Sequence, residues 1–329
     1  MEKYSQFRDR GKQLSVGNVL YAHLLIIFVA SGIAPFLPVV GQVRPLNFVV
    51  KLALFCVRLP LFAFTLLAYF GLLQWLPLGS LGKKACLWAI AGIAGIWWVD
   101  LQIEGVKKGS LARHHSCRLP QPKSIIASSF TSPIDSLYLA AVFDPIFTIT
   151  YPSTAKVRRI SLLQAILHAF SPPETHPTTS ADLTDLSSLL KQYPNQCLVI
   201  YPECTTTNGK GILKLSSSIA SAPAGAKIFP ISLRYTPADI TTPIPRSYLP
   251  FLWKLLSQAT HCIRVGIAEN ITVGEYNSEN ATVGEQQILV ARIGDALAKL
   301  ARVKRVGLGV REKQEFMRIW SKNNMSILG

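Results

Sequence analysis

The sequence predicts an α/β protein whose mostly parallel sheet is sandwiched by helices and preceded by N-terminal membrane-embedded helices. From about residue 100 onward, short apolar segments of strand length alternate with segments that carry apolar residues at helical spacing, which is typical of this fold class. The first hundred residues instead contain three long apolar runs. Hydrophobic residues make up 49% of the chain and charged residues only 16%, which favours a membrane-attached protein over an ordinary soluble enzyme.

The N-terminal region, residues 1–99, is predicted to anchor the protein through apolar runs at 19–40, 59–82 and 85–99. A spanning helix needs roughly 20 apolar residues, so the first two runs are long enough and the third is about one turn short. Basic residues flank the second run on both sides, so the positive-inside rule gives no orientation, and a helical hairpin that dips into one leaflet fits equally well. The alternative is that these runs are buried helices of a large soluble core.

The formal charge of +16, from 34 basic and 18 acidic residues, favours anionic partners. These can be anionic membrane lipids, phosphate-bearing substrates or nucleic acid. The chain has no recognisable nucleic-acid motif, and nucleic-acid binding would leave the apolar runs without a role, so we expect no nucleic-acid partner. The six cysteines form no CxxC pair, so the sequence predicts neither a metal site nor a disulfide framework.

The predicted α/β domain covers residues 100–275. Ser132 is a suitable N-cap for its first helix, and Pro133 suits the first helical position. Because strands alternate with helices along this region, neighbouring strands are predicted to run mostly parallel. In chain order, the pattern predicts a strand at 100–108, a strand at 124–128, helices at 132–143, 160–170 and 183–193, and strands at 196–203, 226–235 and 261–273.

The C-terminal region, residues 276–329, is predicted to form two cationic amphipathic helices within 286–322. Apolar residues recur at helical spacing in the first, and Phe316 and Trp320 lie four residues apart in the second. These helices can close the core with a solvated basic face, or they can lie against anionic lipid; the two roles are compatible. The basic residues are Arg292, Lys299, Arg302, Lys304, Arg305, Arg311, Lys313, Arg318 and Lys322.

Two loops of the α/β domain carry the residue types that chemistry needs. The first, "SSFTSPID" at 128–135, follows a predicted strand and presents hydroxyls and Asp135. The second, "YPECTTTNGK" at 201–210, presents Glu203, three threonines and a lysine. Functional groups of α/β proteins gather at the carboxyl ends of strands, and hydroxyls with a cation can surround a phosphate. Either loop alone is weak evidence, since a threonine-rich turn is more often a surface loop.

Together, in this order and separation, the loops resemble the motifs of the glycerolipid acyltransferase superfamily of the PlsC type, the lysophosphatidic acid acyltransferases. There the first loop reads N-H-x-S-x-x-D and the second carries a Pro-Glu-Gly-Thr signature. The block "FPISLRY" at 229–235 resembles the last family motif, with Pro230 near its start. The basic motif of the family is loosely matched by Lys156, Arg158 and Arg159.

The resemblance implies an enzyme of phospholipid and triacylglycerol synthesis that transfers an acyl group from acyl-CoA, its co-substrate, to lysophosphatidic acid, with no bound cofactor. It implies catalytic positions at Phe130, Ser132 and Asp135. The substrate-binding positions that it implies are Glu203, Thr205, Thr206, Asn208, Lys210, Arg158, Arg159 and Pro230.

The N-terminal stretches "MEKYSQFRDRG" and "GIAPFLP" look like the start of a fungal branch of this superfamily. That branch is associated with the endoplasmic reticulum membrane and the lipid droplet, uses oleoyl-CoA, and is linked to vacuolar protein sorting. The resemblance therefore implies this location, with the α/β domain facing the cytosol. About twenty residues, roughly 12–31, separate the two stretches here, as an extra helix or as an insertion in the gene model.

The first loop departs from the family motif at its catalytic position, because Phe130 stands where the family has its histidine base. Phenylalanine cannot accept a proton, which leaves two hypotheses. The protein is an enzyme that uses a substitute base, with His168, His114, His115 and Glu203 as candidates. Alternatively, it is a lipid-binding scaffold that kept the fold and lost the chemistry. Asp135 would orient a base in the first case, or it would only cap a helix.

Overall fold

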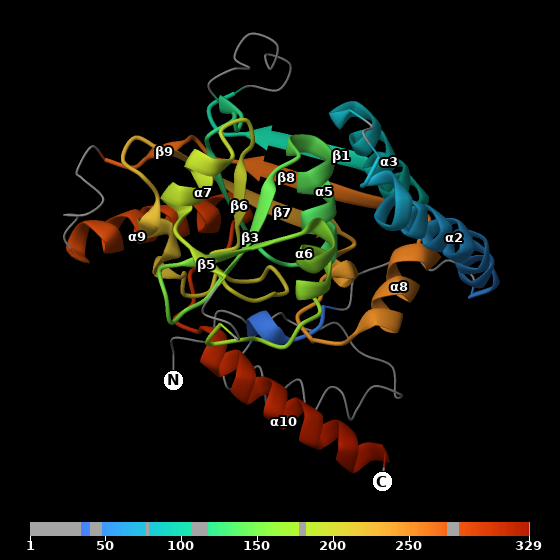
Figure 1. Ribbon diagram of the computed structural model, residues 1–329. Coiled ribbons are helices and arrows are strands. Elements are labelled where there is room, and N and C mark those ends of the chain that lie inside the picture. Colours follow the sequence, from blue (N-terminus) through green and yellow to red (C-terminus); the bar gives the residue numbers. More distant parts are fainter. Residues whose placement is uncertain are drawn as a thin grey trace.

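A computed structural model of the chain describes residues 34–39, 48–76, 79–106, 118–177, 182–274 and 283–328 (Figure 1). Most of the first predicted membrane run, at 19–40, lies outside these residues, as does the segment 12–31. The candidate bases His114 and His115 also lie outside them.

The centre of the molecule is a mixed sheet with the strand order β1-β8-β7-β2-β6-β3-β4-β5. Its four central strands are parallel, so the α/β class and the mostly parallel sheet are confirmed. On one side, β8 is antiparallel to β7 and β1 is parallel to β8. On the other side, β4 is antiparallel to β3 and β5 is antiparallel to β4. The short strand β9 pairs with β7. The bounds are β1 (Ile96–Ile103), β2 (Ile125–Ser128), β3 (Ile146–Thr150), β4 (Val157–Ile160), β5 (Leu183–Thr184), β6 (Leu198–Ile200), β7 (Lys227–Thr236), β8 (His261–Ile267) and β9 (Ile271–Thr272).

Helices cover both faces of the sheet, and successive side chains of each strand serve the two faces in turn. In β2, Ile126 belongs to the apolar cluster that includes residues of α3, α5 and α6, while Ile125 and Ala127 belong to the cluster that includes residues of α7 and α9. Figure 1 shows these two helical layers. The helices are α3 (Ser80–Ile93), α5 (Pro133–Phe143), α6 (Leu162–His168), α7 (Leu186–Gln192), the 3-10 turn η6 (Ser217–Ser221) and α9 (Val283–Ala301).

The second predicted membrane run corresponds to α2 (Phe48–Ala68), which continues as the π-helical turn η4 (Tyr69–Leu73). The helix begins eleven residues before the predicted run and passes through Pro60. Together these residues form a helix of 26 residues that is long and apolar enough to cross a membrane. No α2 side chain is fully buried, and Phe64 and Leu67 are each 71% exposed.

One face of α2 packs against α8 (Tyr248–Ser257). The rings of Phe55 and Trp253 lie 5.0 Å apart between centroids. Arg58 donates hydrogen bonds to the carbonyl oxygens of Gln258 (2.5 Å) and Ala259 (3.0 Å), just beyond α8. The helix is therefore fixed to the α/β domain on one side and leaves apolar residues exposed on the other.

The third predicted membrane run, at 85–99, is not one continuous helix. It starts inside α3, which ends at Ile93, and it finishes inside β1, which begins at Ile96. Gly95 joins the two elements with a φ of 84°, a backbone conformation that glycine adopts at little cost. The four residues Ile96–Val99 are aromatic or β-branched, types that favour strands. The predicted boundary between residues 99 and 100 therefore falls inside a strand of the sheet.

The predicted C-terminal region also contributes to the folded body. Ile293 and Leu297 of α9 are fully buried in the cluster beneath the sheet. The following helix, α10 (Val310–Leu328), has only its first turns against the body and extends away from it, as Figure 1 shows. Those first turns pack on the 3-10 turn η3 (Ala34–Phe36), where the rings of Phe36 and Phe316 lie 5.9 Å apart.

Candidate functional site

The two motif loops meet at one edge of the sheet. Strands β2 and β6 are adjacent and parallel, so the loops that follow them leave from the same edge. The Thr207 N–H donates a hydrogen bond of 2.9 Å to the Phe130 carbonyl oxygen. The rings of Phe130 and Tyr201 stack with centroids 4.3 Å apart. The structure therefore brings 128–135 and 201–210 into direct contact.

Asp135 organises the first loop. It is the third residue of α5 and forms a capping box with Ser132, the N-cap residue. Its Oδ2 atom accepts hydrogen bonds from the backbone N–H groups of Thr131 (2.6 Å) and Ser132 (2.9 Å), and Oδ1 accepts one from the Tyr235 hydroxyl. Burial raises the pKa of Asp135 to about 6, against these hydrogen bonds. Both carboxylate oxygens are thus engaged, as a helix-capping role requires.

A third segment joins the two loops. The Ser132 hydroxyl donates to the Ile240 carbonyl oxygen (2.9 Å), and the Thr242 N–H donates to the Thr131 carbonyl oxygen (2.9 Å). The Thr206 hydroxyl donates to the Thr242 carbonyl oxygen (2.7 Å). The segment from η7 (Ala238–Ile240) to Thr242 is therefore part of the site, although its sequence predicted no such role.

Phe130 lies between two rings, and one of them is an imidazole. His168, at the end of α6, stacks on Phe130 with centroids 5.7 Å apart and planes 15° apart. Its side chain is half-buried. Burial, with the positive charges of Arg158 and Lys313, lowers the pKa of His168 to about 4, so the ring is neutral at neutral pH. Of the candidate substitute bases, His168 thus lies beside the loops, and Glu203 is itself part of the second loop.

Glu203 is a buried carboxyl group, and only one of its two oxygens makes a hydrogen bond of ordinary geometry to a described residue. Its Oε2 atom accepts a hydrogen bond of 3.0 Å from the Leu213 N–H. Its Oε1 atom is buried and makes no hydrogen bond of ordinary geometry to a described residue, although the Phe130 backbone N–H lies close enough to act on the pKa of Glu203. Burial raises the pKa of Glu203 to about 7. This carboxyl group can therefore hold a proton near neutral pH, and its Oε1 atom can accept a hydrogen bond from a hydroxyl group.

Lys313 of α10 places a cation inside the second loop, which the sequence did not predict. Its side chain is fully buried. The Nζ atom donates to the Thr205 hydroxyl (2.9 Å), the Thr206 hydroxyl (3.0 Å) and the Thr206 carbonyl oxygen (2.5 Å). Burial lowers the pKa of Lys313 to about 7, against the opposing effect of Glu203. The predicted cation of this loop, Lys210, is exposed instead.

A sequence signal for Lys313 does exist. Residues three apart share a helix face, and Lys313 lies three residues after Val310 and three before Phe316, both of which are buried. A lysine on the apolar face of an amphipathic helix either pairs with buried polar groups or extends its amine to water. The other basic residues of the tail that the structure describes are exposed.

Asn208 binds the N-terminal segment and not an open surface. Its N–H donates to the Pro35 carbonyl oxygen (2.9 Å), and its Nδ2 atom donates to the Leu37 carbonyl oxygen (2.8 Å). Phe36, between these two residues, is fully buried. Residues 34–37 therefore cover one side of the second loop.

The remaining predicted substrate-binding residues divide into two groups. Arg158 shares a face of β4 with Ile160, on the side of α5 and α6, and its charge acts on His168. Arg159 points to the opposite face, where its guanidinium lies 4.6 Å from the centre of the Tyr193 ring. Pro230 is buried within β7 and pairs with Ala127 of β2. The structure thus brings Arg158, but neither Arg159 nor Pro230, to the side of the site.

The motif residues form a closed network. Apart from Lys210, Arg158, Arg159 and the strand residue Pro230, every predicted site residue is exposed by 5% or less. The segments 34–37, 240–242 and the first turns of α10 lie over the two loops. The closed residues are Phe130, Ser132, Asp135, Glu203, Thr205, Thr206 and Asn208.

No protein-family model matches the chain. A protein of Schizosaccharomyces pombe (strain 972 / ATCC 24843) that is named "Putative lysophosphatidic acid:oleoyl-CoA acyltransferase" is 25% identical to it over 335 residues. The match covers 99% of this chain and 100% of that relative. The resemblance to the fungal acyltransferase branch is confirmed. The similarity reaches well beyond the motif loops and supports a general acyltransferase function.

Proposed function

We propose that this protein is a membrane-attached acyltransferase that transfers an acyl group from acyl-CoA to lysophosphatidic acid or a related lysophospholipid. The observation that carries the proposal is the meeting of the two motif loops, with two buried carboxyl groups and a neutral imidazole around Phe130. The name of the S. pombe relative supports this choice of substrates. The product would be phosphatidic acid, a precursor of triacylglycerol.

The reaction needs a group that accepts a proton from the acceptor hydroxyl. As the hydroxyl oxygen bonds to the thioester carbon, the carbon–sulfur bond breaks, and the leaving thiolate of CoA takes up a proton. Phe130 cannot take part in this transfer, and we assign the base to His168, whose neutral ring lies parallel to the Phe130 ring at 5.7 Å. General base catalysis contributes about 10²–10⁴-fold, and a thioester is already activated, so positioning supplies much of the remainder.

The other residues hold the loops in position, bind the acceptor lipid and supply charge. Asp135 fixes the first loop through its hydrogen bonds to Thr131 and Ser132. The Oε1 atom of Glu203 can accept a hydrogen bond from the acceptor lipid once the segments that cover it move. Lys313 holds Thr205 and Thr206 of the second loop in place and can add positive charge there.

The acyl chain would lie between α5 and α2. A small apolar cavity of about 50 Å³ lies there, lined by Ile134 and Leu137 of α5 and by Phe62 and Leu66 of α2. Since the opposite face of α2 is exposed and apolar, a chain that extends beyond this cavity reaches the surface that we assign to the membrane.

We place the protein at the endoplasmic reticulum membrane and the lipid droplet, with the α/β domain facing the cytosol. Support comes from α2 and from exposed apolar residues next to it on α3 and β1. Trp97 and Trp98 of β1 are 68% and 69% exposed, and tryptophan is enriched at membrane–water interfaces. The basic residues of α9 and α10 would add contacts with anionic lipid.

The test is an acyl-transfer assay on purified full-length protein with labelled oleoyl-CoA and lysophosphatidic acid. We expect His168→Ala to lower kcat by about 10²-fold, the low end of the range for general base catalysis, because a base whose pKa is about 4 is weak at neutral pH. Leu167→Ala is the matched control, since Leu167 is a half-exposed neighbour on the same helix and should change kcat less than twofold. A full rate in His168→Ala would refute the base assignment. A full rate in Asp135→Asn and Glu203→Ala as well would refute an enzyme at these loops.

A lipid-binding scaffold without turnover is the second candidate function. The closed network of motif residues favours it, because a lipid headgroup could reach these residues only after the covering segments move. Wild-type protein would then bind lysophosphatidic acid saturably but transfer no acyl group. Phe130→His is the complementary experiment: a large gain in rate would show that the scaffold still presents position 130 to substrate.

A further inference from the structure

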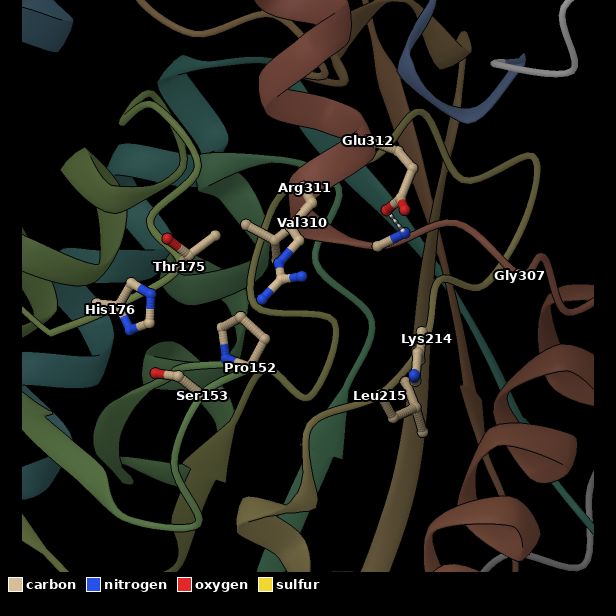
Figure 2. Close-up of a pocket in the computed structure, with 11 residues that line it drawn as sticks. Pro152, Ser153, Thr175, His176, Lys214, Leu215, Gly307, Val310, Arg311 and Glu312 are labelled. Carbon is tan, nitrogen blue, oxygen red and sulfur yellow. Dashed lines mark hydrogen bonds between the residues drawn. The ribbon is translucent and has the colours of Figure 1, made fainter.

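A cavity of about 400 Å³ opens beside the second motif loop (Figure 2). Its walls are the turn after β3 (152–153), the loop residues 175–176, the strand-like segment 214–215 and the start of α10. Lys214 directly follows Leu213, whose N–H binds Glu203. Arg311, on the α10 wall, lies two residues before Lys313. The cavity therefore adjoins the loop from two sides.

The walls are fixed to one another by hydrogen bonds. The Lys214 N–H donates to the Leu308 carbonyl oxygen (2.9 Å), which joins two walls. The Ser216 hydroxyl donates to the Tyr151 carbonyl oxygen (2.8 Å), and the Gln314 side chain donates to the Pro173 carbonyl oxygen (2.8 Å). Such a cavity is preformed, as small-molecule sites usually are, and its volume is within their range of about 300–1,000 Å³.

The cavity carries an excess of positive charge. Figure 2 shows the Arg311 guanidinium directed into the cavity, with Lys214 on one side and His176 on the other. Neither Arg311 nor Lys214 forms an ion pair with an acidic residue in the described part of the chain. The carboxylate in the lining, that of Glu312, accepts a hydrogen bond of 2.7 Å from the Gly309 N–H, as the dashed line in Figure 2 marks.

These observations favour an anionic ligand. Two exposed cations without acidic partners line one cavity that is partly open to solvent. The first N–H groups of α10 add partial positive charge at the same wall, part of which the Glu312 carboxylate offsets. The volume exceeds what a single phosphate ion needs, so an organic phosphate fits better than an inorganic ion. Arginine and lysine are the side chains that usually bind phosphate groups.

We propose that this cavity binds the phosphate-bearing part of a substrate whose reactive end lies at the motif loops. The proposal rests on the acyltransferase function proposed above. The phosphate groups can belong to the nucleotide end of acyl-CoA or to the headgroup of the lysophospholipid, and the experiment distinguishes these sources.

The test is calorimetric titration of the full-length protein in detergent with two probes, adenosine 3′,5′-bisphosphate and glycerol 3-phosphate. We expect saturable binding of at least one probe by the wild type. The double variant Lys214→Ala, Arg311→Ala should weaken it at least tenfold, because two charge-assisted contacts are lost. The control is Lys191→Ala, Lys227→Ala, which removes the same charge from exposed residues outside the cavity and should change affinity less than twofold.

The probe that binds identifies the source of the phosphate. The proposal is overturned if the wild type binds neither probe, or if the cavity variant binds as well as the control. Turnover separates it from the proposed function. Binding that depends on Lys214 and Arg311 in a protein without turnover would uphold the cavity and refute the enzyme. Turnover with the same KM values in the cavity variant and the wild type would uphold the enzyme and refute the cavity.

Discussion

At the scale of single residues, the ring of Phe130 and the amine of Lys313 lie at the contact of the two motif loops. Phe130 cannot accept a proton, and its ring provides the flat surface on which His168 stacks. Lys313 is the buried amine that contacts the second loop, whereas Lys210, which belongs to that loop, is exposed. The two side chains that contact the motif loops in this way, His168 and Lys313, are thus distant in sequence from the motifs.

We predict that Lys313 makes stability depend on pH above neutrality. Its pKa falls from 10.5 to about 7 on folding, so between these values the unfolded chain binds more protons than the folded one. The free energy of unfolding therefore rises with pH across this window. Lys313→Met removes the effect. Between pH 7 and pH 10, the free energy of unfolding of the wild type should therefore rise by roughly 1–3 kcal/mol relative to that of the variant.

Thermal or denaturant unfolding at several pH values measures this difference. Lys191→Met, at an exposed position on α7, is the control and should follow the wild type at every pH. Parallel stability profiles for the wild type and Lys313→Met would contradict the buried, weakly basic amine.

The sequence predicted the two motif loops and their contact, but it did not predict that His168 and Lys313 would pack against them. Strand-to-helix loops are local features, and the carboxyl ends of adjacent parallel strands must share an edge. The approach of α6 and α10 to that edge depends on long-range packing, which no local pattern of the chain encodes. His168 was recognised only as one of four candidate bases, and Lys313 only as one of nine basic residues of the tail.

At the scale of elements, helix α5 is the best example of local sequence deciding structure. Ser132, Pro133 and Asp135 give the N-cap, the first helical position and the capping box, and the helix begins where the sequence predicted. By contrast, β3 and β4 were not predicted, although they are no shorter than β2, and two of the four residues of β4 are arginines, which give no apolar strand pattern. Helix α8 was missed as well.

We predict that the α5 capping box stabilises the protein more than the exposed capping box of α6. Asp135→Ala leaves two backbone N–H groups and the Tyr235 hydroxyl without partners in a buried place, which should cost about 2–4 kcal/mol. Gln164→Ala removes the matching residue of the α6 box, whose partner groups are exposed to water, and should cost about 1 kcal/mol or less.

Denaturant unfolding of both variants gives the comparison. Equal costs would mean that burial adds nothing to the role of Asp135 and that its hydrogen bonds are those of an ordinary helix cap.

At the scale of the whole molecule, the exposed apolar residues gather where α2, α3 and β1 lie together (Figure 1). The motif loops lie at the carboxyl edge of the central strands, and residues of α5 connect this edge to α2 through the small apolar cavity. A lipid substrate would then have its chain near α2 and its headgroup near α10.

We predict that α2 holds the protein on membranes independently of salt. Phe64→Asp, Leu67→Asp places two charges in an exposed apolar face, each costing about 2.5–3.5 kcal/mol at the centre of a membrane. The fraction of protein that stays on liposomes in 1 M salt (about 3 Å screening length) should fall at least tenfold. Ile288→Asp on α9 is the control, since Ile288 is also exposed (59%) but lies away from α2.

Flotation of full-length protein with liposomes measures the bound fraction. Full salt-resistant binding by the α2 variant would assign attachment to the basic C-terminal helices, whose attraction to anionic lipid salt weakens.

The contacts that cover the second loop come from parts of the chain made at very different times. Asn208 binds Leu37, 171 residues earlier, and Thr205 binds Lys313, 108 residues later. The central strands β7, β2, β6 and β3 and both motif loops lie between these two partners in the sequence. A chain cut short before residue 313 would therefore contain the whole central sheet and both motif loops but would lack the lysine that closes the second loop from the C-terminal side.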